Sequence, residues 1–427
     1  MIFVSISCKF FIKTMKTLLE RGIKMKKVYV IGAKRSAIGS FMGTLAPLHP
    51  ADFGSQVLRQ LLDETKIQVK EIDEVLIGNI LPAGLKQGVA RQISINSGIP
   101  TSVPAYGVNM VCGSGMKTMM NAFSNIASGL HQLVIAGGVE SMSNAPYLVP
   151  AQVRMGVKMG EQPMRDHMLY DALTDAFDGE HMGMTAERIV EKYGLTREEQ
   201  DAFAWNSQQK AMKAQDQGRF KDEIAPVVIK TRKGDIVFDQ DEYINRSTNL
   251  EKLGNLRPAF KKDGSVTAGS SSGINDGASF TILASEDYVK RHNIKPLAEV
   301  IGIGQGGVDP SVMGLGPTPA IRQALKHANL KLNDIELFEL NEAFAAQSLG
   351  VIKELVDEHH VTKEWILDRT NLNGGAIALG HPVGASGNRI VVTLIHEMMK
   401  QENVNVGLAS LCIGGGMGTA IILKKVK

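Results

Sequence analysis

The sequence predicts an α/β fold built as an internal duplication, with a long insert between the two halves. Three observations indicate this. Stretches typical of buried strands alternate with amphipathic helices, a pattern that favours βαβ units and a mostly parallel sheet. The second half of the chain repeats the order of the first. The segment between them, residues 144–273, has a different texture that is richer in Met, Asp, Gln and Arg.

The first half supplies the elements in their order. We expect a strand (27–31), a turn containing Arg35, Ser36 and Gly39 (32–43), an amphipathic helix (50–66), a strand (74–80), a loop and helix (84–96), a strand, turn and helix around Cys112 that reach about Gly129, and a strand (132–136). The first helix is assigned from apolar residues at helical spacing, namely Phe53, Val57, Leu58, Leu61 and Leu62.

Four matches in the same order indicate the duplication. They pair 28–32 with 299–302, 73–79 with 336–341, the Cys112 turn with 373–375, and 134–138 with 409–412 and the glycines that follow. Equivalent turns of the two halves are expected to meet across a shared interface. The expected domains are 25–143, completed by about 274–296, then the insert 144–273, and finally 297–427.

The insert contains one clear helix and one unusual turn. Thr196 and Glu199 have the spacing of a capping box, and the helix they begin should run to Asp216, with residues 206–210 facing water. Its predicted apolar positions are Phe203, Ala204, Ala211 and Met212. The insert ends in the small residues 267–273, which suit close approach of a ligand, although a flexible linker shares this composition.

Composition limits the class of protein. The chain has 427 residues, 44% of them hydrophobic and 21% charged, which is typical of a soluble globular protein, and no apolar run could span a membrane. Its three cysteines leave no disulfide framework, so we expect a reducing, cytoplasmic location. The chain has a formal net charge of +3, of which residues 1–24 contribute +4 and the remaining residues −1. A nearly neutral body predicts no nucleic-acid partner.

The N-terminal residues 1–24 are expected to be an extension outside the fold. The stretch lacks a good secretory core and cleavage site, because Lys9 interrupts its apolar start. A basic organellar presequence stays open, although arginine is scarce. The interpretation we favour is that Met25 is the working start, because a strand follows it at once.

Two cysteines and a histidine lie in glycine-rich turns. Cys112 follows an apolar run and precedes Gly-Ser-Gly and a helix, which predicts a sulfur over a helix N-terminus, where thiolate is favoured. The alternative for Cys112, and for Cys412 in Cys-Ile-Gly-Gly-Gly-Met-Gly, is a small core residue. The flanking glycines favour function, because glycine permits close approach of another molecule.

Four motifs together resemble the thiolase family, from about Lys26 to the C-terminus: Val-Cys-Gly-Ser-Gly at Cys112, Asn-Glu-Ala-Phe at Asn341, Gly-His-Pro-Val-Gly-Ala-Ser-Gly at His381, and the turn at Cys412. The resemblance implies thiolase-type halves forming a layered α/β/α/β/α core. His181-Met182-Gly183 is similar to the acetoacetyl-CoA thiolases within that family. One departure, Arg35-Ser36 where Thr-Pro is usual, affects only a turn.

The resemblance also implies roles. Cys112 would be the acylated nucleophile, His381 would take its proton, and Cys412 would be the acid/base at the α-carbon. His381 and a water held by Asn341 would bind the enolate oxygen, and the N–H groups of Cys112 and Gly414 the thioester oxygen. His381 could instead be a structural turn residue, and Asn341 a helix cap.

The implied substrate-binding residues come mainly from the insert. Ser272 and Gly273 would lie near the pantetheine of coenzyme A, and Arg246 is a weaker match for its nucleotide end. The acyl pocket would include His181 and Met182, which could equally be packing residues. Ala268 and Phe344 complete the implied set. Coenzyme A is then a substrate or product, and neither a cofactor nor a metal is expected.

The implied activity is that of an acetyl-CoA C-acetyltransferase, which joins two acetyl-CoA reversibly into acetoacetyl-CoA and coenzyme A and belongs to lipid metabolism. The alternatives are a degradative 3-ketoacyl-CoA thiolase of broader chain length and a non-catalytic acyl-CoA-binding protein. A ketoacyl synthase would show a histidine where Asn341-Glu342-Ala343-Phe344 stands. The family also suggests a homotetramer, a dimer of dimers, with residues 143–164 as an inter-dimer arm.

Overall fold

The order of the strands confirms the duplication. The computed structural model describes residues 25–426, so the interpretations of residues 1–24 lie outside the described residues. The first half contributes β1 (Val28–Arg35), β3 (Glu74–Gly78), β4 (Ala105–Val108), β5 (Leu133–Ser141) and β10 (Asn275–Ser285). The second half contributes β11 (Ala298–Gly307), β12 (Leu337–Leu340), β13 (Val406–Ile413) and β14 (Met417–Lys425).

The two halves are joined edge to edge. The strand order is β12-β13-β14-β11-β1-β10-β5-β3-β4, and the short β2 (Gly39–Ser40) pairs with β10. The halves meet where β1 pairs with β11 through Tyr29↔Glu299 and Val30↔Ala298. The register of β1 on β10 shifts between Val30 and Gly32, and that of β11 on β14 between Val300 and Gly302. The same irregularity therefore recurs at matching positions.

The expectation of a mostly parallel sheet is wrong. Only β3–β4, β3–β5 and β12–β13 pair in parallel, whereas β1–β10, β10–β5, β11–β14, β13–β14 and β1–β11 are antiparallel. Each half ends with a strand that reverses the sheet. Because β14 follows β13 through a tight glycine turn, the two can pair only as antiparallel neighbours.

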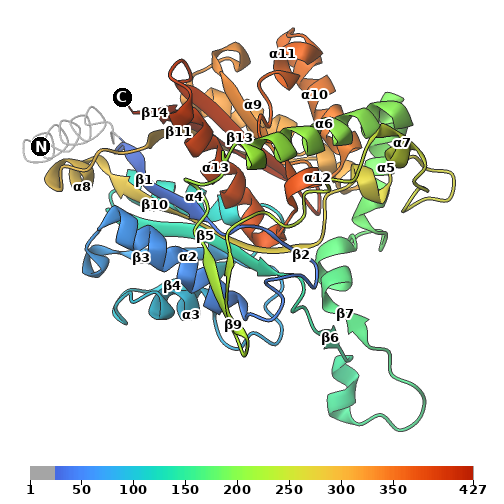
Figure 1. Cartoon of the computed structure of the whole chain (residues 1–427), viewed down its shortest axis with the longest axis horizontal. Helices are drawn as coiled ribbons and strands as arrows, with labels where there is room; N and C mark the ends of the chain where they lie inside the picture. Colours follow the sequence, from blue (N-terminus) through green and yellow to red (C-terminus); the bar gives the residue numbers. More distant parts are fainter. Residues whose placement is uncertain (1–24, 427) are drawn as a thin grey trace, which may run out of the picture.

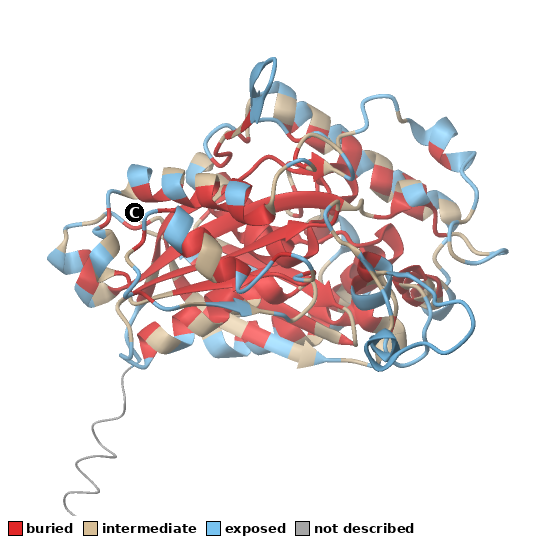
Figure 2. Ribbon diagram, turned by 90° about the horizontal axis from the view of Figure 1, so that it is seen from below, coloured by how far each residue is buried: buried red, intermediate tan, exposed pale blue. Residues whose placement is uncertain are grey.

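Five layers result, as the family resemblance implied. One outer layer holds α2 (Pro50–Thr65) and α3 (Val89–Asn96), the other α9 (Pro317–Ala328) and α10 (Ala345–His359). Between the halves of the sheet lie α4 (Ser114–Ala127) and α13 (Val383–Lys400), packed on both (Figure 1). Every residue from Val383 to Ile395 is buried, as expected of a helix enclosed on all sides. Figure 2 shows that buried residues fill the interior of the molecule.

The other elements belong mostly to the insert. The helices are α5 (Met182–Tyr193), α6 (Arg197–Asp216), α7 (Leu250–Gly254), α8 (Glu286–Arg291), α11 (Lys363–Leu367) and α12 (Ala376–Leu379). Two hairpins pair β6 (Tyr147–Leu148) with β7 (Arg165–Asp166) and β8 (Val227–Thr231) with β9 (Gly234–Phe238). Short turns of helix cover Val69–Glu71, Ala151–Met155, Leu169–Leu173, Ala268–Ser270, Pro310–Leu315 and Leu332–Asp334.

The capping box that begins α6 is confirmed, but the prediction that residues 206–210 face water is wrong in part. Ser207 and Gln208 are buried. The Ser207 hydroxyl donates to the Glu342 carboxylate, and the Gln208 amide donates to the Ile377 carbonyl. Polar residues that face another domain with satisfied hydrogen bonds cannot be told from solvated ones by their spacing.

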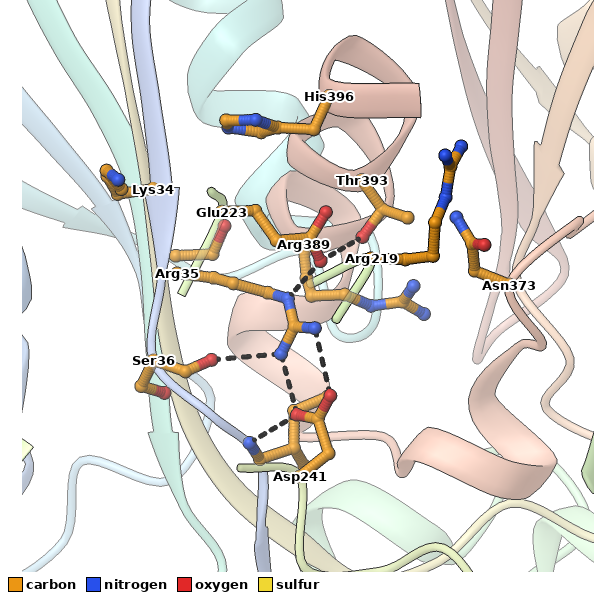
Figure 3. Close-up of polar contacts among 12 residues, drawn as sticks. Lys34, Arg35, Ser36, Arg219, Glu223, Asp241, Asn373, Arg389, Thr393 and His396 are labelled. Atoms are coloured by element: carbon orange, nitrogen blue, oxygen red, sulfur yellow. Dashed lines mark hydrogen bonds and ion pairs between the residues drawn. The ribbon is translucent and has the colours of Figure 1, made fainter. Parts of the chain in front are cut away.

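Residues 32–35 continue β1 and are not part of a turn as predicted. Arg35, at the end of the strand, is completely buried. Its guanidinium donates to Glu223 at 2.6 Å and to both oxygens of Asp241 at 2.7 and 2.9 Å (Figure 3). Both carboxylates come from the insert, far along the chain. They neutralise the Arg35 guanidinium, which would otherwise be expected at the surface, and they hold the insert against β1.

The β6–β7 hairpin extends away from the body of the molecule (Figure 1). On this projection Met155 and Met159 are 83% and 93% exposed. Within the described residues, no helix combines the length and the apolar character needed to cross a membrane.

Candidate active site

The site lies where α4 and α13 begin. Cys112 stands two residues before α4, and His381 two residues before α13. Each helix directly precedes the strand that pairs in parallel with β3 or β12 in its own half, namely β5 or β13. The repeat partner of the Cys112 turn is therefore the His381 turn, and the predicted match with residues 373–375 is wrong.

Glycines let the two helix starts cross in contact. A Cβ on Gly138 would lie 2.0 Å from the Gly384 carbonyl oxygen, and one on Gly115 2.8 Å from the Asn388 nitrogen. A Cβ on Gly78 would meet Ser114 and Gly384 at 2.7 and 2.8 Å. Any side chain at these positions would push the helices apart, so the glycines bring the cysteine and histidine turns together.

The Cys112 turn is held in an unusual conformation. Val111 has a φ of 44°, which a β-branched residue rarely adopts. The Ser114 hydroxyl accepts from the Met110 N–H at 2.8 Å and donates to the Val111 carbonyl at 2.7 Å. This bridge fixes the backbone on both sides of Val111 and aims Cys112, which remains partly accessible.

The β13–β14 turn closes the site from the other half. A Cβ on Gly113 would meet Ile413 at 2.3 Å, and one on Gly414 would lie 3.5 Å from Val111. The Gly414 N–H acts on the Cys112 sulfur and lowers the pKa of its thiol. Cys412, near the end of β13, is buried in a cluster with Met182 of the insert, Met313 of the turn Pro310–Leu315, Ala346 of α10, and Ala343 and Phe344 just before that helix.

The resting Cys112 is a thiol, and the predicted thiolate is not favoured. Burial raises the pKa of Cys112 to about 11, although the Gly414 and Cys112 N–H groups act to lower it. Burial also raises the pKa of the Cys412 thiol, and the neighbouring Cys112 raises it further. Loss of hydration outweighs the helix terminus here, so the resting sulfur keeps its proton.

The His381 imidazole is neutral and is held in one tautomer. Burial, followed by the charge of Arg389, lowers the pKa of His381 to about 3, so the imidazole is neutral at pH 7. Its Nδ1 lies 2.5 Å from the Ser386 hydroxyl oxygen, which itself donates to the Pro382 carbonyl at 2.9 Å. Because a hydroxyl has one hydrogen, Nδ1 must donate and Nε2 keeps its lone pair. Nε2 is buried and has no partner among the described residues.

Asn341 directly follows β12 and is 1% exposed. Neither end of its amide bonds to another described residue. Buried amides are rarely left unpaired, and such a group is suited to hold a water molecule. It does not cap α10, which begins at Ala345 with Phe344 as its N-cap.

A cavity of about 510 Å³ opens beside these groups. Seven of the predicted residues line it: His181, Met182, Ala268, Ser272, Gly273, Phe344 and His381. Residues that sequence reasoning missed also line it: Ser40, Phe41, Met142, Leu173, Tyr243, Ala259, Phe260, Ser271, Ile274 and Val383. Nothing in their spacing marks them, because they come from separate loops. A neighbouring cavity of about 410 Å³ shares Tyr243 and Ala268.

His181 and Met182 both combine packing with a place in the cavity wall. His181 is the N-cap of α5, where its Nδ1 accepts from the Gly183 N–H at 3.0 Å. Its ring is stacked on Phe260 with 4.8 Å between centroids, and burial lowers its pKa. The neutral ring therefore carries its proton on Nε2. Gly183 allows this packing, because a Cβ there would lie 2.2 Å from Phe260.

Arg246 is not in the wall of either cavity. It is exposed, and its guanidinium pairs with Asp216 at 2.7 Å. In the described part of the chain no group of three or more His, Cys, Asp or Glu residues is arranged to hold a metal ion.

His381 lines the cavity, whereas the two thiols pack in clusters that include residues of its wall, Cys412 with Met182 and Phe344 and Cys112 with Met142 and Val383. Two thiols and a neutral imidazole are the groups of an enzyme that transfers acyl groups through cysteine. Residues 28–287 match the family model "Thiolase, N-terminal domain" and residues 294–425 match "Thiolase, C-terminal domain". The chain therefore belongs to the thiolase family, and it is an acyltransferase.

Individual relatives agree. A probable acetyl-CoA acyltransferase of Staphylococcus aureus is 50% identical over 404 residues, 94% of this chain and 100% of that protein. The Bacillus anthracis acetyl-CoA acetyltransferase superposes with a TM-score of 0.90 at 40% identity, covering 95% and 100% of the two chains. The human mitochondrial 3-ketoacyl-CoA thiolase gives 0.89 at 41% identity, covering 94% and 100%.

Proposed function

We propose that this acetyl-CoA acyltransferase is an acetyl-CoA C-acetyltransferase, which converts two acetyl-CoA reversibly into acetoacetyl-CoA and coenzyme A. One observation carries the preference for a short acyl group. The Met182 sulfur lies 3.6 Å from where a Cβ on Gly414 would stand, and the Gly414 N–H acts on the Cys112 sulfur, whose pKa it lowers. A bulky side chain therefore stands directly beside the proposed thioester and limits its length.

The first half-reaction uses Cys112 and His381. His381 Nε2 takes the proton of the Cys112 thiol, and the sulfur attacks the acetyl-CoA carbonyl carbon. The carbonyl oxygen gains negative charge, which the N–H groups of Cys112 and Gly414 would stabilise. The C–S bond to coenzyme A then breaks, and His381 returns its proton to the leaving thiolate. The product is acetyl-Cys112 with His381 neutral again.

The second half-reaction uses Cys412. Its thiolate removes a methyl proton from the second acetyl-CoA, and the resulting carbanion attacks acetyl-Cys112. The enolate oxygen would be held by His381 and by a water on Asn341, whose amide has no other described partner. The C–S bond to Cys112 breaks and acetoacetyl-CoA is released. The Cys112 thiolate then takes up a proton from solvent, which balances the proton that Cys412 gave to solvent when it ionised, so both cysteines end as thiols.

The state of Cys412 supports this assignment. A negative charge on Cys112 would raise the Cys412 pKa, in addition to burial. The thioester of acetyl-Cys112 cannot carry that charge. Cys412 is therefore the thiol that can ionise at the step after acetylation. In the reverse direction its protonated thiol is the form that can reprotonate the carbanion.

A degradative 3-ketoacyl-CoA thiolase is the second candidate, because the cavity also has an apolar side lined by Met142, Leu173, Ile274 and Val383. Measuring kcat/KM for thiolysis of acetoacetyl-CoA and of medium- and long-chain 3-ketoacyl-CoA separates the two. We expect the highest value for acetoacetyl-CoA. Preference for longer chains would favour the second candidate, and the absence of any coenzyme A release would favour a non-catalytic acyl-CoA-binding protein.

The proposed partners are acetyl-CoA, acetoacetyl-CoA and coenzyme A, with no separate cofactor. Ser272 and Gly273 are proposed to contact pantetheine, since both line the cavity and the Ser272 N–H is tied to the Ala343 carbonyl. The arm of residues 143–164 is proposed to join dimers into a homotetramer, because its exposed apolar residues have no cover within the described chain. Light scattering that gives a monomer would contradict this.

A further inference from the structure

The duplication assigns a counterpart to each active-site residue. The β3–β5 ladder ends at Gly78↔Gly138, and the β12–β13 ladder ends at Leu340↔Ser410. Counting onward from these pairs, Asn79 corresponds to Asn341 and Glu140 to Cys412. Glu140 is therefore the residue that the first half places where the second half places its acid/base thiol.

Glu140 joins three segments behind the site. Its Oε1 accepts from the Asn79 amide at 2.9 Å and from the Leu81 N–H at 3.2 Å. Its Oε2 accepts from the Ile80 N–H at 3.0 Å and from the Gly384 N–H at 3.0 Å. Gly384 is three residues after His381, in the first turn of α13.

All four partners are donors, so the carboxylate fits only when it is ionised. Glu140 is completely buried, and no basic side chain bonds to it. Burial raises its pKa to about 7, with Asp276 on β10 adding to the rise, while the N–H groups of Ile80, Leu81 and Gly384 lower it. A buried charge without a counter-ion is costly, which points to a role in placing its donors.

We propose that Glu140 is a positioning residue for His381: its carboxylate ties the start of α13 to the loop after β3 and so fixes the imidazole against Cys112. This rests on the base role of His381 proposed above. The packing leaves little freedom, because a Cβ on Gly384 would lie 2.6 Å from Glu140 Oε2 and 3.1 Å from the Asn79 Cα. At this pair of matching positions, the second half thus carries the acid/base residue Cys412 and the first half carries the positioning residue Glu140.

The test uses Glu140→Gln with Asp73→Asn as the matched control. Asp73 accepts from the Gln132 and Leu133 N–H groups at 2.6 and 2.9 Å, at the opposite end of β5 from the site. Both variants keep the shape of the side chain, remove its charge and put an amide against N–H donors. If Glu140→Gln fails to fold, Asn79→Ala removes one of the four donors and is the milder variant.

Two measurements decide. In thiolysis, Glu140→Gln should lower kcat by about 10- to 100-fold with KM changed by less than about threefold, as expected when a catalytic group is misplaced. Asp73→Asn should keep kcat. In hydrogen exchange followed by mass spectrometry, Glu140→Gln should speed exchange in peptides covering 80–81 and 382–386, and Asp73→Asn only around 132–133. Asn79→Ala should show smaller effects of the same kind as Glu140→Gln.

Equal kcat in Glu140→Gln and Asp73→Asn, or unchanged exchange at 382–386, would overturn the proposal. The exchange measurement needs no substrate. If the parent enzyme lacked thiolase turnover, the proposed function would fail while faster exchange at 382–386 in Glu140→Gln still supported the positioning of α13.

Discussion

Ser386→Ala is expected to slow catalysis, because the His381 tautomer that carries its proton on Nδ1 is then no longer stabilised. The Ser386 hydroxyl is completely buried, donates to the Pro382 carbonyl and accepts from His381 Nδ1–H. Alanine removes both bonds and leaves the Nδ1–H without its partner. The tautomer that carries its proton on Nε2 is then no longer disfavoured, and in that form the imidazole cannot take the Cys112 proton.

The size of the effect follows from the lost contact. A buried donor left unpaired costs about 1–3 kcal/mol. If the Nδ1–H tautomer of His381 is destabilised by that amount, the rate should change by roughly 5- to 150-fold. We expect kcat/KM for thiolysis, and the rate of Cys112 acetylation by acetyl-CoA, to fall within that range. Nitrogen-15 NMR of labelled histidine should show His381 changing from the Nδ1–H form to a mixture.

Ser279→Ala is the matched control, because the buried Ser279 hydroxyl donates to Asn388 on the same helix at 2.7 Å and does not touch His381. It should lose stability without losing rate. Ser386→Thr keeps a hydroxyl and should retain more activity than Ser386→Ala. A Ser386→Ala enzyme within twofold of Ser279→Ala, or one with an unaltered histidine spectrum, would refute the reasoning.

Three further outcomes are expected. Cys112→Ala should lose acetyl labelling by acetyl-CoA. Cys412→Ala should still be acetylated at Cys112, but it should condense roughly 10²–10⁴-fold more slowly and lose exchange of the methyl protons with solvent. A Cys412→Ala enzyme that is not acetylated would contradict these roles. Met182→Ala should raise relative kcat/KM for longer 3-ketoacyl-CoA, modestly, since each methylene contributes about 0.8 kcal/mol; an unchanged chain-length profile makes Met182 structural. Burial lowers the pKa of His381 to about 3, whereas unfolded histidine titrates near 6.5, so below that pH the unfolded chain binds the extra proton and stability falls as pH drops. Denaturant midpoints of His381→Gln should depend less on pH between 7 and 4 than those of the parent, and equal slopes would argue against it.

The strand pairing shows one boundary of sequence reasoning. The elements of the first half were largely predictable, since the helix over 50–66 buries all five of its predicted apolar residues. Their pairing was not predictable, because β10 enters the sheet only after the long insert. Alternation of strands and helices indicates the order of elements along the chain and says nothing of a strand that returns from elsewhere.

Long-range partners set the other boundary. From the sequence Arg35 is expected in a turn, but in the structure it is buried and paired with Glu223 and Asp241. Ser207 is expected to face water, but it is hydrogen-bonded to Glu342. The protonation state of Cys112 was mispredicted for the same reason. Its glycine turn suggests an activated thiolate, but burial in the folded protein raises the pKa of the thiol to about 11.

The sequence by itself determined the candidate reacting residues, because local motifs mark them: Cys112, Asn341, His381 and Cys412 each lie in a short stretch whose glycines or neighbours are distinctive. Only the tertiary structure decided what supports them. Ser386 and Glu140 act through contacts made after the two halves close on each other, and the cavity wall is assembled from separate loops. A motif of consecutive residues is visible in the sequence. The burial, tautomer and ionisation state of a side chain depend instead on which distant groups pack around it and exclude water.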